Sequence, residues 1–529
     1  MPLSTPLCRP ALTALSLLAI AAAPHALTAQ STSSASALRT AVTTYRKAHE
    51  ADILREFSAL LELPNLASDS ANIRRNAAAV IALLEKRGAS ARLLESPAGG
   101  PPAVYGELRT AGATETILFY AHYDGQPVNV AQWATAPWSP TLRDGPLEGG
   151  GKVVPLPTTN GTTGPEWRLY ARSAGDDKAP IVAVLAALDA MRDGGIAPSV
   201  NLKFYFDGEE EAGNPHTRAL LERHAALLKS DGIIFADGPV HQSRQQTVVF
   251  GVRGITDVVV TAYGPLRALH SGHYGNWAPN PAVTMARFIT ALRDENGRIL
   301  IPGFDKDVRP LSAADRRALA TVPTADSALR RELGLAATEA SNALLAERIM
   351  LPALNIRSIH AGGTGAAANA IPVDASASID FRLVPDQTPA HVKELVEAYA
   401  TRLGYTVIHA APDSALRRSK PRLLRFDWGA EGYPAERTRA DTPFGRAVVR
   451  AVGEGLGTPI IQVPTMGGSA PTYLFAQILK APLVLVPIAN HDDNQHASNE
   501  NLRLQNLWDG ISVYSGLLAR LGHPTPPVP

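Results

Sequence analysis

A histidine and an aspartate, one position apart, end the apolar stretch "LFYAHYDGQP", residues 118–127. Because side chains two positions apart on a strand point to the same face, His122 and Asp124 should project together from the end of this strand. A His-x-Asp pair also occurs by chance at purely structural positions. The pair therefore indicates a functional site only if other polar residues join it.

Acidic side chains follow several other strand-like segments. They are Asp176 and Asp177 after "RLYARSAG", Glu209, Glu210 and Glu211 after "LKFYFDG", and Asp237 after "GIIFA", while "LVLVPI" leads into "ANHDDNQHASNE" with His491 and His496. Taken singly, each acid has an ordinary alternative as a helix cap or an exposed turn. Ligands of open α/β sheets bind outside the carboxyl ends of the strands, so we expect these side chains at one edge.

So many converging carboxylates would repel one another unless positive charge lay among them, and no Lys or Arg cluster stands in these segments. Histidine with carboxylate and without thiolate suits Zn²⁺, with Mn²⁺ or Co²⁺ as substitutes. The sequence therefore predicts a metal site.

Composition narrows the class of protein. With 529 residues, 45% hydrophobic and 19% charged, the chain is expected to form two globular domains. The net charge of +1 comes without long runs of one sign, so we expect no nucleic-acid partner, no membrane partner and a small-molecule substrate. Cys8 is the only cysteine and lies in the N-terminal segment, which excludes disulfides and thiol chemistry from the rest of the chain.

The N-terminal residues 1–29 are predicted to be a secretory signal peptide. Arg9 supplies positive charge, "ALTALSLLAIAAAP" is apolar but short for a stable span, and "ALTAQ" offers a cleavage site after Ala29. A retained membrane anchor is the alternative. We therefore expect a periplasmic or secreted protein, in which the Ser- and Thr-rich residues 30–42 form a flexible lead-in.

Strand-like and helical segments alternate over residues 30–251, which predicts the α/β class: a mainly parallel sheet with helices on both faces. The Gly- and Pro-rich residues 145–166 are expected to form a long surface loop without a chemical role. The pattern changes over 252–414, which predicts an inserted α+β domain, and residues 415–529 resume the first domain.

A series of motifs, in chain order, resembles the M20 family of dinuclear zinc peptidases, close to its carnosinase-like dipeptidase branch. They are "AHYDGQP", "ARSAGDDKAP", "DGEEEAGNP", "FADGP", "LHSGHYGNW", "MGGSAP" and "HASNENL". The resemblance implies a zinc-peptidase-like catalytic domain in 30–251 and 415–529. It also implies that 252–414 is a lid and dimerisation domain, through which we expect a homodimer.

The resemblance further implies two Zn²⁺ per subunit and the residues that hold them. One ion would be held by His122, Asp176 and Asp237, and the other by Asp176, Glu211 and His496. Asp176 is chosen as the bridging ligand because the family's aspartate precedes "x-Lys", and Asp177 is then expected to cap the following helix. His491 remains an alternative to His496.

Other roles follow from the same resemblance. Glu210 would be the general base for the attacking water, Asp124 would fix the His122 ring by a hydrogen bond, and His270 would reach the reacting carbonyl from the partner subunit. The substrate's carboxylate end would meet Arg382, Asn369, Gly467, Gly468 and Ser469. Thr465 and Met466 stand where cytosolic dipeptidases have Arg-Glu, which leaves the choice of substrate open.

We therefore expect a secreted or periplasmic metallopeptidase that hydrolyses dipeptides or short peptides with a free C-terminal carboxylate. An N-acyl amino acid amidohydrolase using the same metals is the alternative enzyme. A non-catalytic binding protein on the same fold is a third possibility, and the retention of every ligand and of the base argues against it.

Overall fold

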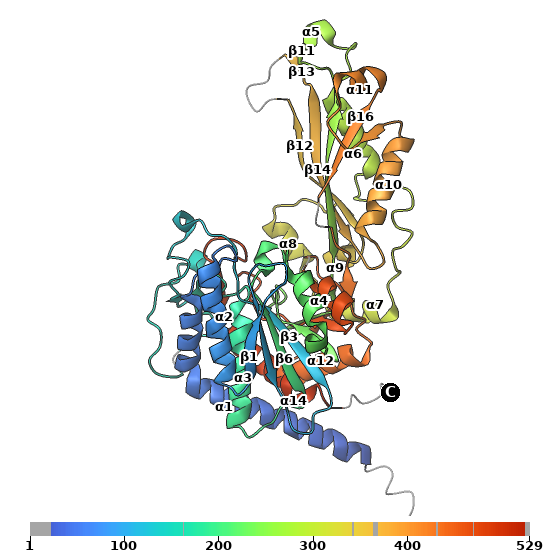
Figure 1. The fold of residues 1–529 in the computed structure, drawn as a ribbon. Coiled ribbons are helices and arrows are strands. Elements are labelled where there is room, and N and C mark those ends of the chain that lie inside the picture. The colour runs from blue at the N-terminus through green and yellow to red at the C-terminus, as the bar shows by residue number, and fades with distance from the viewer. Residues whose placement is uncertain are drawn as a thin grey trace, which may run out of the picture.

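The chain forms two domains, the second inserted into the first (Figure 1). The computed structural model describes residues 23–161, 163–340, 343–362, 369–429, 432–468 and 470–523. The first domain is built on an eight-stranded sheet. Its strands, in spatial order, are β1 (Ser90–Leu94), β2 (Ala103–Leu108), β6 (Asn201–Asp207), β3 (Thr116–His122), β7 (Gly232–Phe235), β19 (Leu483–Leu485), β8 (Thr247–Val249) and β18 (Ile461–Val463).

The centre of this sheet is parallel. β6, β3, β7 and β19 pair in parallel, with His122 opposite Asp207 and Tyr120 opposite Phe235. The pairs β1–β2, β2–β6 and β19–β8 are antiparallel, so the sheet is mixed. The predicted α/β class is confirmed. Parallel central strands bring their carboxyl ends to one edge, which is where the predicted site residues follow them.

Helices cover both faces of the sheet (Figure 1). One face carries α1 (Ala23–Leu61), α2 (Ser70–Glu85), α3 (Lys178–Asp193), α12 (Pro443–Leu456) and α14 (Leu504–Arg520), and the other carries α4 (Thr217–Leu228) and α13 (Thr472–Leu479). The β3 side chains alternate accordingly, because Phe119 packs into the first core and Tyr120 into the second. Three short 3-10 helices lie in loops: η1 (Val130–Gln132), η2 (Leu147–Gly149) and η3 (Glu210–Ala212).

The expected flexible lead-in over residues 30–42 is wrong. These residues belong to α1, and Ala35, Leu38 and Val42 are buried. Their spacing of three and four residues places them on one helix face, so apolar periodicity decided the structure and the Ser- and Thr-rich composition did not. The loop 145–166 joins β4 to β5 as expected, and the Glu50 carboxylate of α1 accepts hydrogen bonds from its Gly161 and Thr163.

The second domain has its own sheet and core. Its five strands are β12 (Ala353–Ala361), β14 (Asp374–Leu383), β10 (Gly254–Tyr263), β16 (Leu423–Trp428) and β15 (Thr406–Ile408). Its helices are α5 (Ser271–Tyr274), α6 (Pro281–Leu292), α7 (Ala313–Leu319), α8 (Asp326–Glu332), α9 (Leu345–Ile349), α10 (Pro389–Arg402) and α11 (Ser414–Ser419). Because β16 pairs with β10, the second sheet takes in chain beyond residue 414, the boundary predicted for the insertion.

Three small sheets are also present in the described part of the chain. They are β11 (Leu269–His270) with β13 (Ala370–Ile371), β17 (Glu436–Arg437) with β9 (Gly251–Val252), and β20 (Asn501–Arg503) with β5 (Arg168–Tyr170) and β4 (Thr141–Arg143). Within the described residues, none of the helices combines the length and the apolar character needed to cross a bilayer. The predicted signal peptide lies mostly in residues 1–22, outside the described residues, and its last residues belong to α1.

Candidate functional site

Side chains from one strand end and from several loops meet at the carboxyl edge of the main sheet. His122 ends β3, Glu211 lies in η3 after β6, and Asp237 follows β7. Asp176 comes from the loop before α3, and His496 from the loop between β19 and β20. One expectation was wrong: "RLYARSAG" contributes β5 to a separate small sheet, so Asp176 reaches the edge from a loop and not from a strand of the main sheet.

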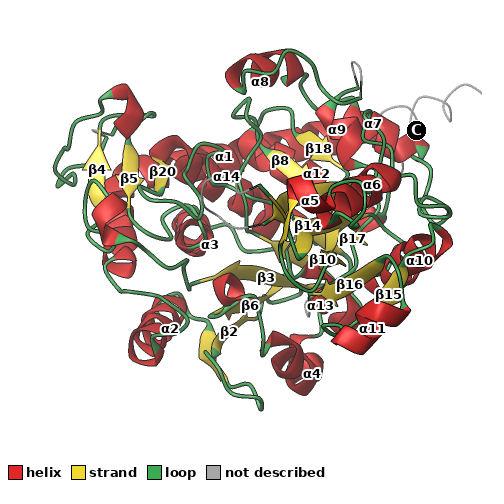
Figure 2. Cartoon of the chain, turned by 90° about the horizontal axis from the view of Figure 1, so that it is seen from above, coloured by secondary structure: helices red, strands yellow, loops and turns green. Residues whose placement is uncertain are grey.

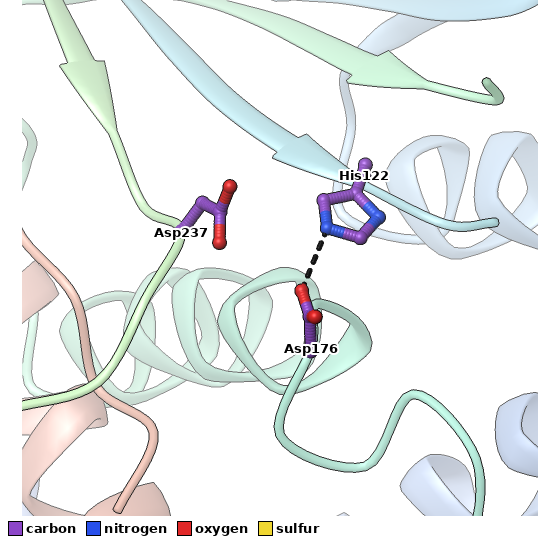
Figure 3. A group of neighbouring side chains, drawn as sticks. All are labelled: His122, Asp176 and Asp237. Atoms are coloured by element: carbon purple, nitrogen blue, oxygen red, sulfur yellow. Dashed lines mark hydrogen bonds and ion pairs between the residues drawn. The ribbon is translucent and has the colours of Figure 1, made fainter. Parts of the chain in front are cut away.

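The first group of potential metal ligands is His122, Asp176 and Asp237, whose ligand atoms all lie within 4.8 Å of one another. Figure 3 shows the three side chains facing a common space, with His122 and Asp237 reaching it from neighbouring strands. His122 is completely buried, and its Nε2 lies 2.9 Å from Asp176 Oδ1. One imidazole nitrogen and carboxylate oxygens converging at this spacing form a donor set that suits zinc.

The second group shares Asp176 with the first and adds Glu211 and His496, again within 4.8 Å. His496 Nε2 lies 3.1 Å from Asp176 Oδ2 and 3.2 Å from Glu211 Oε2. The backbone of His496 has φ of +60°, a left-handed conformation that non-glycine residues adopt mainly where the surroundings enforce it. His491, the alternative to His496, belongs to neither group of potential ligands. The structure therefore places His496, and not His491, beside Asp176 and Glu211.

Asp124 links the histidine to the short helix that carries the two glutamates. Its Oδ1 lies 3.2 Å from His122 Nδ1, the ring nitrogen from which we expected Asp124 to accept a hydrogen bond. The carboxylate also accepts hydrogen bonds from the backbone N–H groups of Glu210 (3.2 Å, to Oδ1) and Glu211 (3.0 Å, to Oδ2). The buried Asp124 carboxylate thereby caps the start of η3, where such N–H groups lack helical partners.

The expected capping role of Asp177 is wrong. Asp177 occupies the N-cap position of α3, but its side chain makes no capping hydrogen bond there. Its Oδ2 accepts the backbone N–H of His122 at 3.2 Å, across the sheet edge. Asp177 therefore fixes the end of β3, which holds the histidine in place.

Glu500 supports the site, although its position in "HASNENL" suggested no role for it. Its buried carboxylate accepts hydrogen bonds from Arg172 Nη1 at 2.6 Å and from the backbone N–H groups of Ser173, Gly175 and Asp176, each at 3.0 Å. These bonds hold the loop that presents Asp176. A glutamate in a ligand-rich motif was the only sequence signal for this function.

Two glutamines bind the carboxylates of the second group. Gln495 Nε2 donates to Asp176 Oδ2 at 2.9 Å, and Gln126 Nε2 donates to Glu211 Oε2 at 2.8 Å. Both glutamines stand beside predicted site residues in the chain, but an amide next to a ligand is a weak signal in sequence. In the structure each amide restricts the orientation of one carboxylate.

The carboxylates repel one another electrostatically. Burial, together with the charge of Asp176, raises the pKa of Asp237 to about 7 and that of Glu211 to about 7. Burial also raises the pKa of Glu210 well above its usual range. Hydrogen bonds with Asp176 and Glu211 raise the pKa of His496 to about 10. Carboxylates that resist ionisation for lack of positive charge fit a site for divalent cations.

The cationic side chains around the cluster are used elsewhere. Burial lowers the pKa of Lys178 to about 7, and its Nζ donates to the main-chain oxygen atoms of Leu60 and Leu63. Arg172 pairs with Glu500 at 2.6 Å. Neither cation contacts the carboxylates of the two ligand groups, so neither supplies the positive charge that these carboxylates lack.

The remaining predicted residues lie apart from these groups. His270 is exposed in β11, at the end of the second domain far from the main sheet (Figure 1), and its Nδ1 accepts the N–H of Gly272. The main-chain oxygen of Asn369, beside β13, accepts the N–H of Ser271. Arg382 lies in β14, where its Nε donates to Asp380 at 3.1 Å.

The predicted glycine loop stands at the junction of the two domains. Gly467 and Gly468 follow β18, and the main-chain oxygen of Gly468 accepts the N–H of Arg253, the residue between β9 and β10. Ser469 lies outside the described residues. The structure thus brings the predicted metal ligands and Glu210 together, and it leaves His270 and Asn369 at the far end of the second domain.

Comparison with known proteins identifies the family. The model of the peptidase family M20/M25/M40 matches residues 118–520. The chain belongs to this peptidase family. The Cys-Gly metallodipeptidase dug1 of Schizosaccharomyces pombe is 25% identical over 440 residues, covering 80% of this chain and 84% of the relative. The β-Ala-His dipeptidase of Homo sapiens is 24% identical over 428 residues, covering 80% and 78%.

Solved structures of M20 peptidases share the fold. An M20 family metallo-carboxypeptidase from Sulfolobus solfataricus matches with a TM-score of 0.69 at 26% identity, covering 89% of this chain and 99% of that one. The dipeptidase Dug1p of Saccharomyces cerevisiae matches with a TM-score of 0.67 at 21% identity, covering 92% and 98%. The predictions of M20 membership and of a metallopeptidase are confirmed.

Proposed function

We propose that this M20 metallopeptidase hydrolyses dipeptides or short peptides that carry a free C-terminal carboxylate, and that it does so in the periplasm or outside the cell. One observation carries the chemical part: two groups of three ligands share Asp176, and Glu210 precedes the ligand Glu211 in η3. The names of the relatives, a Cys-Gly and a β-Ala-His dipeptidase, support dipeptides as substrates.

The proposed metal ligands are the residues of the two groups. His122, Asp176 and Asp237 would hold one Zn²⁺, and Asp176, Glu211 and His496 would hold the other. Such a pair of ions supplies Lewis acidity to the substrate carbonyl and lowers the pKa of water. Asp124 and Glu500 position the ligands from behind, through the hydrogen bonds to η3 and to the Asp176 loop.

Glu210 is the proposed general base. Its backbone N–H is held by Asp124, and burial with neighbouring carboxylates raises its pKa. A carboxylate with a raised pKa accepts the proton of the attacking water more readily and then donates it to the nitrogen of the leaving amine. The reaction is direct hydrolysis of an amide, without a covalent intermediate on the enzyme.

A homodimer through the second domain is part of the proposal. β12 is an edge strand of its sheet, and Ile359 on it is 58% exposed. Beside β11, Leu266 is 59% exposed and Trp277 is 79% exposed. Exposed edges and apolar side chains are usually covered in native assemblies. In such a dimer the partner subunit's His270 would complete the site, because β11 lies far from its own main sheet (Figure 1).

Substrate screening tests the function. The purified chain, loaded with Zn²⁺, should hydrolyse Ala-Leu and release both amino acids, which chromatography detects. Ala-Leu amide is the matched control, because it lacks only the free carboxylate and should be a poor substrate. Hydrolysis of N-acetyl-leucine with no cleavage of any dipeptide would instead identify an N-acyl amino acid amidohydrolase.

A further inference from the structure

A large cavity lies between the edge of the main sheet and the short helices of the insertion. Its volume is about 620 Å³, within the range of about 300–1,000 Å³ typical of small-molecule sites. One wall comes from β8, β18 and the segments that follow β7 and β18, and the other from α7, α8 and α9. α7 packs against β18, and Figure 2 shows these two elements side by side.

Two segments that line the cavity also belong to the proposed catalytic site or lead away from it. Pro239, which lines it, follows the proposed ligand Asp237 by two residues. Gly467, the first glycine of the predicted carboxylate-binding loop, lines it as well. A substrate whose carboxylate met the Gly467 loop would therefore have its C-terminal residue next to the cavity.

Hydrogen bonds hold the wall formed by α7, α8 and α9 against the main sheet. The N–H of Gln462 in β18 donates to Thr321 Oγ1 just after α7, at 2.8 Å. Arg253, at the domain junction, donates from Nη2 to the main-chain oxygen atoms of Arg348 and Leu351 around α9. The cavity is therefore bounded by elements that are tied to each other across the domain junction.

The lining of the cavity indicates the chemistry of its ligand. Valine, leucine, isoleucine and methionine are the commonest lining side chains, among them Val249, Leu329, Ile349 and Met466. Ionisable side chains line the cavity as well: His241, Arg316, Asp326, Glu347 and His491. Two lining residues, Thr465 beside Gly467 and Thr247 in β8, have a buried Oγ1 atom without a hydrogen-bond partner, which is unusual for a buried hydroxyl. A mainly apolar pocket with a few polar groups suits an apolar side chain on a polar backbone.

We propose that this cavity binds a large apolar side chain, such as that of leucine, methionine or phenylalanine, on the C-terminal residue of the substrate. The inference rests on the proposed peptidase function and adds the substrate class. The enzyme would then prefer Ala-Leu to Ala-Gly, because only the leucine side chain transfers apolar surface from water into the cavity.

Two cavity-filling substitutions test the proposal. Ala346 in α9 and Ala325 just before α8 line the cavity and are half-buried, so Ala346→Phe and Ala325→Phe should each occupy part of it. Ala328→Phe is the matched control, because Ala328 is an exposed residue of α8 outside the lining. Each variant is loaded with Zn²⁺, and kcat/KM is measured for Ala-Leu and Ala-Gly.

The readout is the ratio of kcat/KM for Ala-Leu to that for Ala-Gly. We expect a ratio of at least ~10 in the unmodified enzyme, because each additional methylene group of a substrate that a hydrophobic pocket binds raises kcat/KM by about this factor. Both cavity-filling variants should lower the ratio at least ~5-fold, and the control should keep it. A ratio near one in the unmodified enzyme, or an equal loss on both substrates in both filled variants, would overturn the proposal.

A binding measurement separates this proposal from the proposed function. If no dipeptide is hydrolysed, the peptidase assignment fails, and calorimetric titration with Ala-Leu and Ala-Gly decides the question of the cavity. Tighter binding of Ala-Leu that disappears in Ala346→Phe and Ala325→Phe supports an apolar side-chain pocket. Equal binding of the two peptides contradicts it.

Discussion

Replacing Asp124 by asparagine tests whether this residue positions the metal ligands. The Asp124 carboxylate uses one oxygen for the N–H of Glu210 and the other for the N–H of Glu211, and Oδ1 also lies 3.2 Å from His122 Nδ1. An asparagine side chain has the same shape but only one oxygen. Its amide NH₂ would face a backbone N–H, so one hydrogen bond must be lost.

The magnitude follows from that lost bond. A hydrogen bond to a charged group contributes about 1.5–3 kcal/mol. If the lost hydrogen bond weakens only the conformation in which η3 holds Glu211 in position, its free energy corresponds to a decrease in metal affinity of about 10- to 100-fold. Removing a group that orients a metal ligand usually has an effect of this size. If the lost hydrogen bond also destabilises the folded protein, the free energy of unfolding decreases.

The assay is a competition titration of Zn²⁺ against a chromophoric chelator, with denaturant unfolding of the metal-free protein measured in parallel. Asp231→Asn is the matched control, because the Asp231 carboxylate accepts the N–H of Thr116 at 2.8 Å, at the opposite end of β3. The metal affinity of the Asp231→Asn variant should equal that of the unmodified protein. If Asp124→Asn bound both ions as tightly as the unmodified protein and unfolded at the same denaturant concentration, Asp124 would not position the site.

Three further predictions concern the base, the dimer and the N-terminus. Glu210→Gln should retain metal and lower kcat at least ~10²-fold, because the amide cannot take the proton of water, whereas His122→Ala should lose metal; metal analysis with turnover measurements distinguishes the two. Mixed Glu210→Gln and His270→Ala subunits should regain activity, because a heterodimer contains one site with both residues intact; an inactive mixture with heterodimers proven by native mass spectrometry would refute this arrangement. N-terminal sequencing of the mature protein should begin at or near Gln30, and recovery of Met1 from a membrane fraction would contradict the signal peptide.

The sequence predicted best those features that depend on short-range periodicity. Near-continuous apolar strands followed by acids placed His122 and Asp237 at one sheet edge, because parallel strands share their carboxyl ends. The segment leading to Asp176 looked the same in sequence, but its strand β5 pairs with β4 and β20 in another sheet. Strand pairing depends on partners far away in the chain, so local pattern alone did not assign β5 to its sheet.

The roles of the supporting acids depend even more on tertiary contacts. Asp176 and Asp177 are neighbours with identical side chains. Asp176 belongs to both groups of potential metal ligands, whereas Asp177 accepts the backbone N–H of His122. The Asp176 loop is held by Glu500, a residue 324 positions away, whose only sequence signal is its place in the "HASNENL" motif. A buried carboxylate that accepts several backbone N–H groups is stabilised only in the folded chain, where those donors are brought to it. Residue types and spacing could therefore indicate which side chains would bind metal in the proposed site, whereas the contacts that orient those side chains are set by the packing of both halves of the first domain.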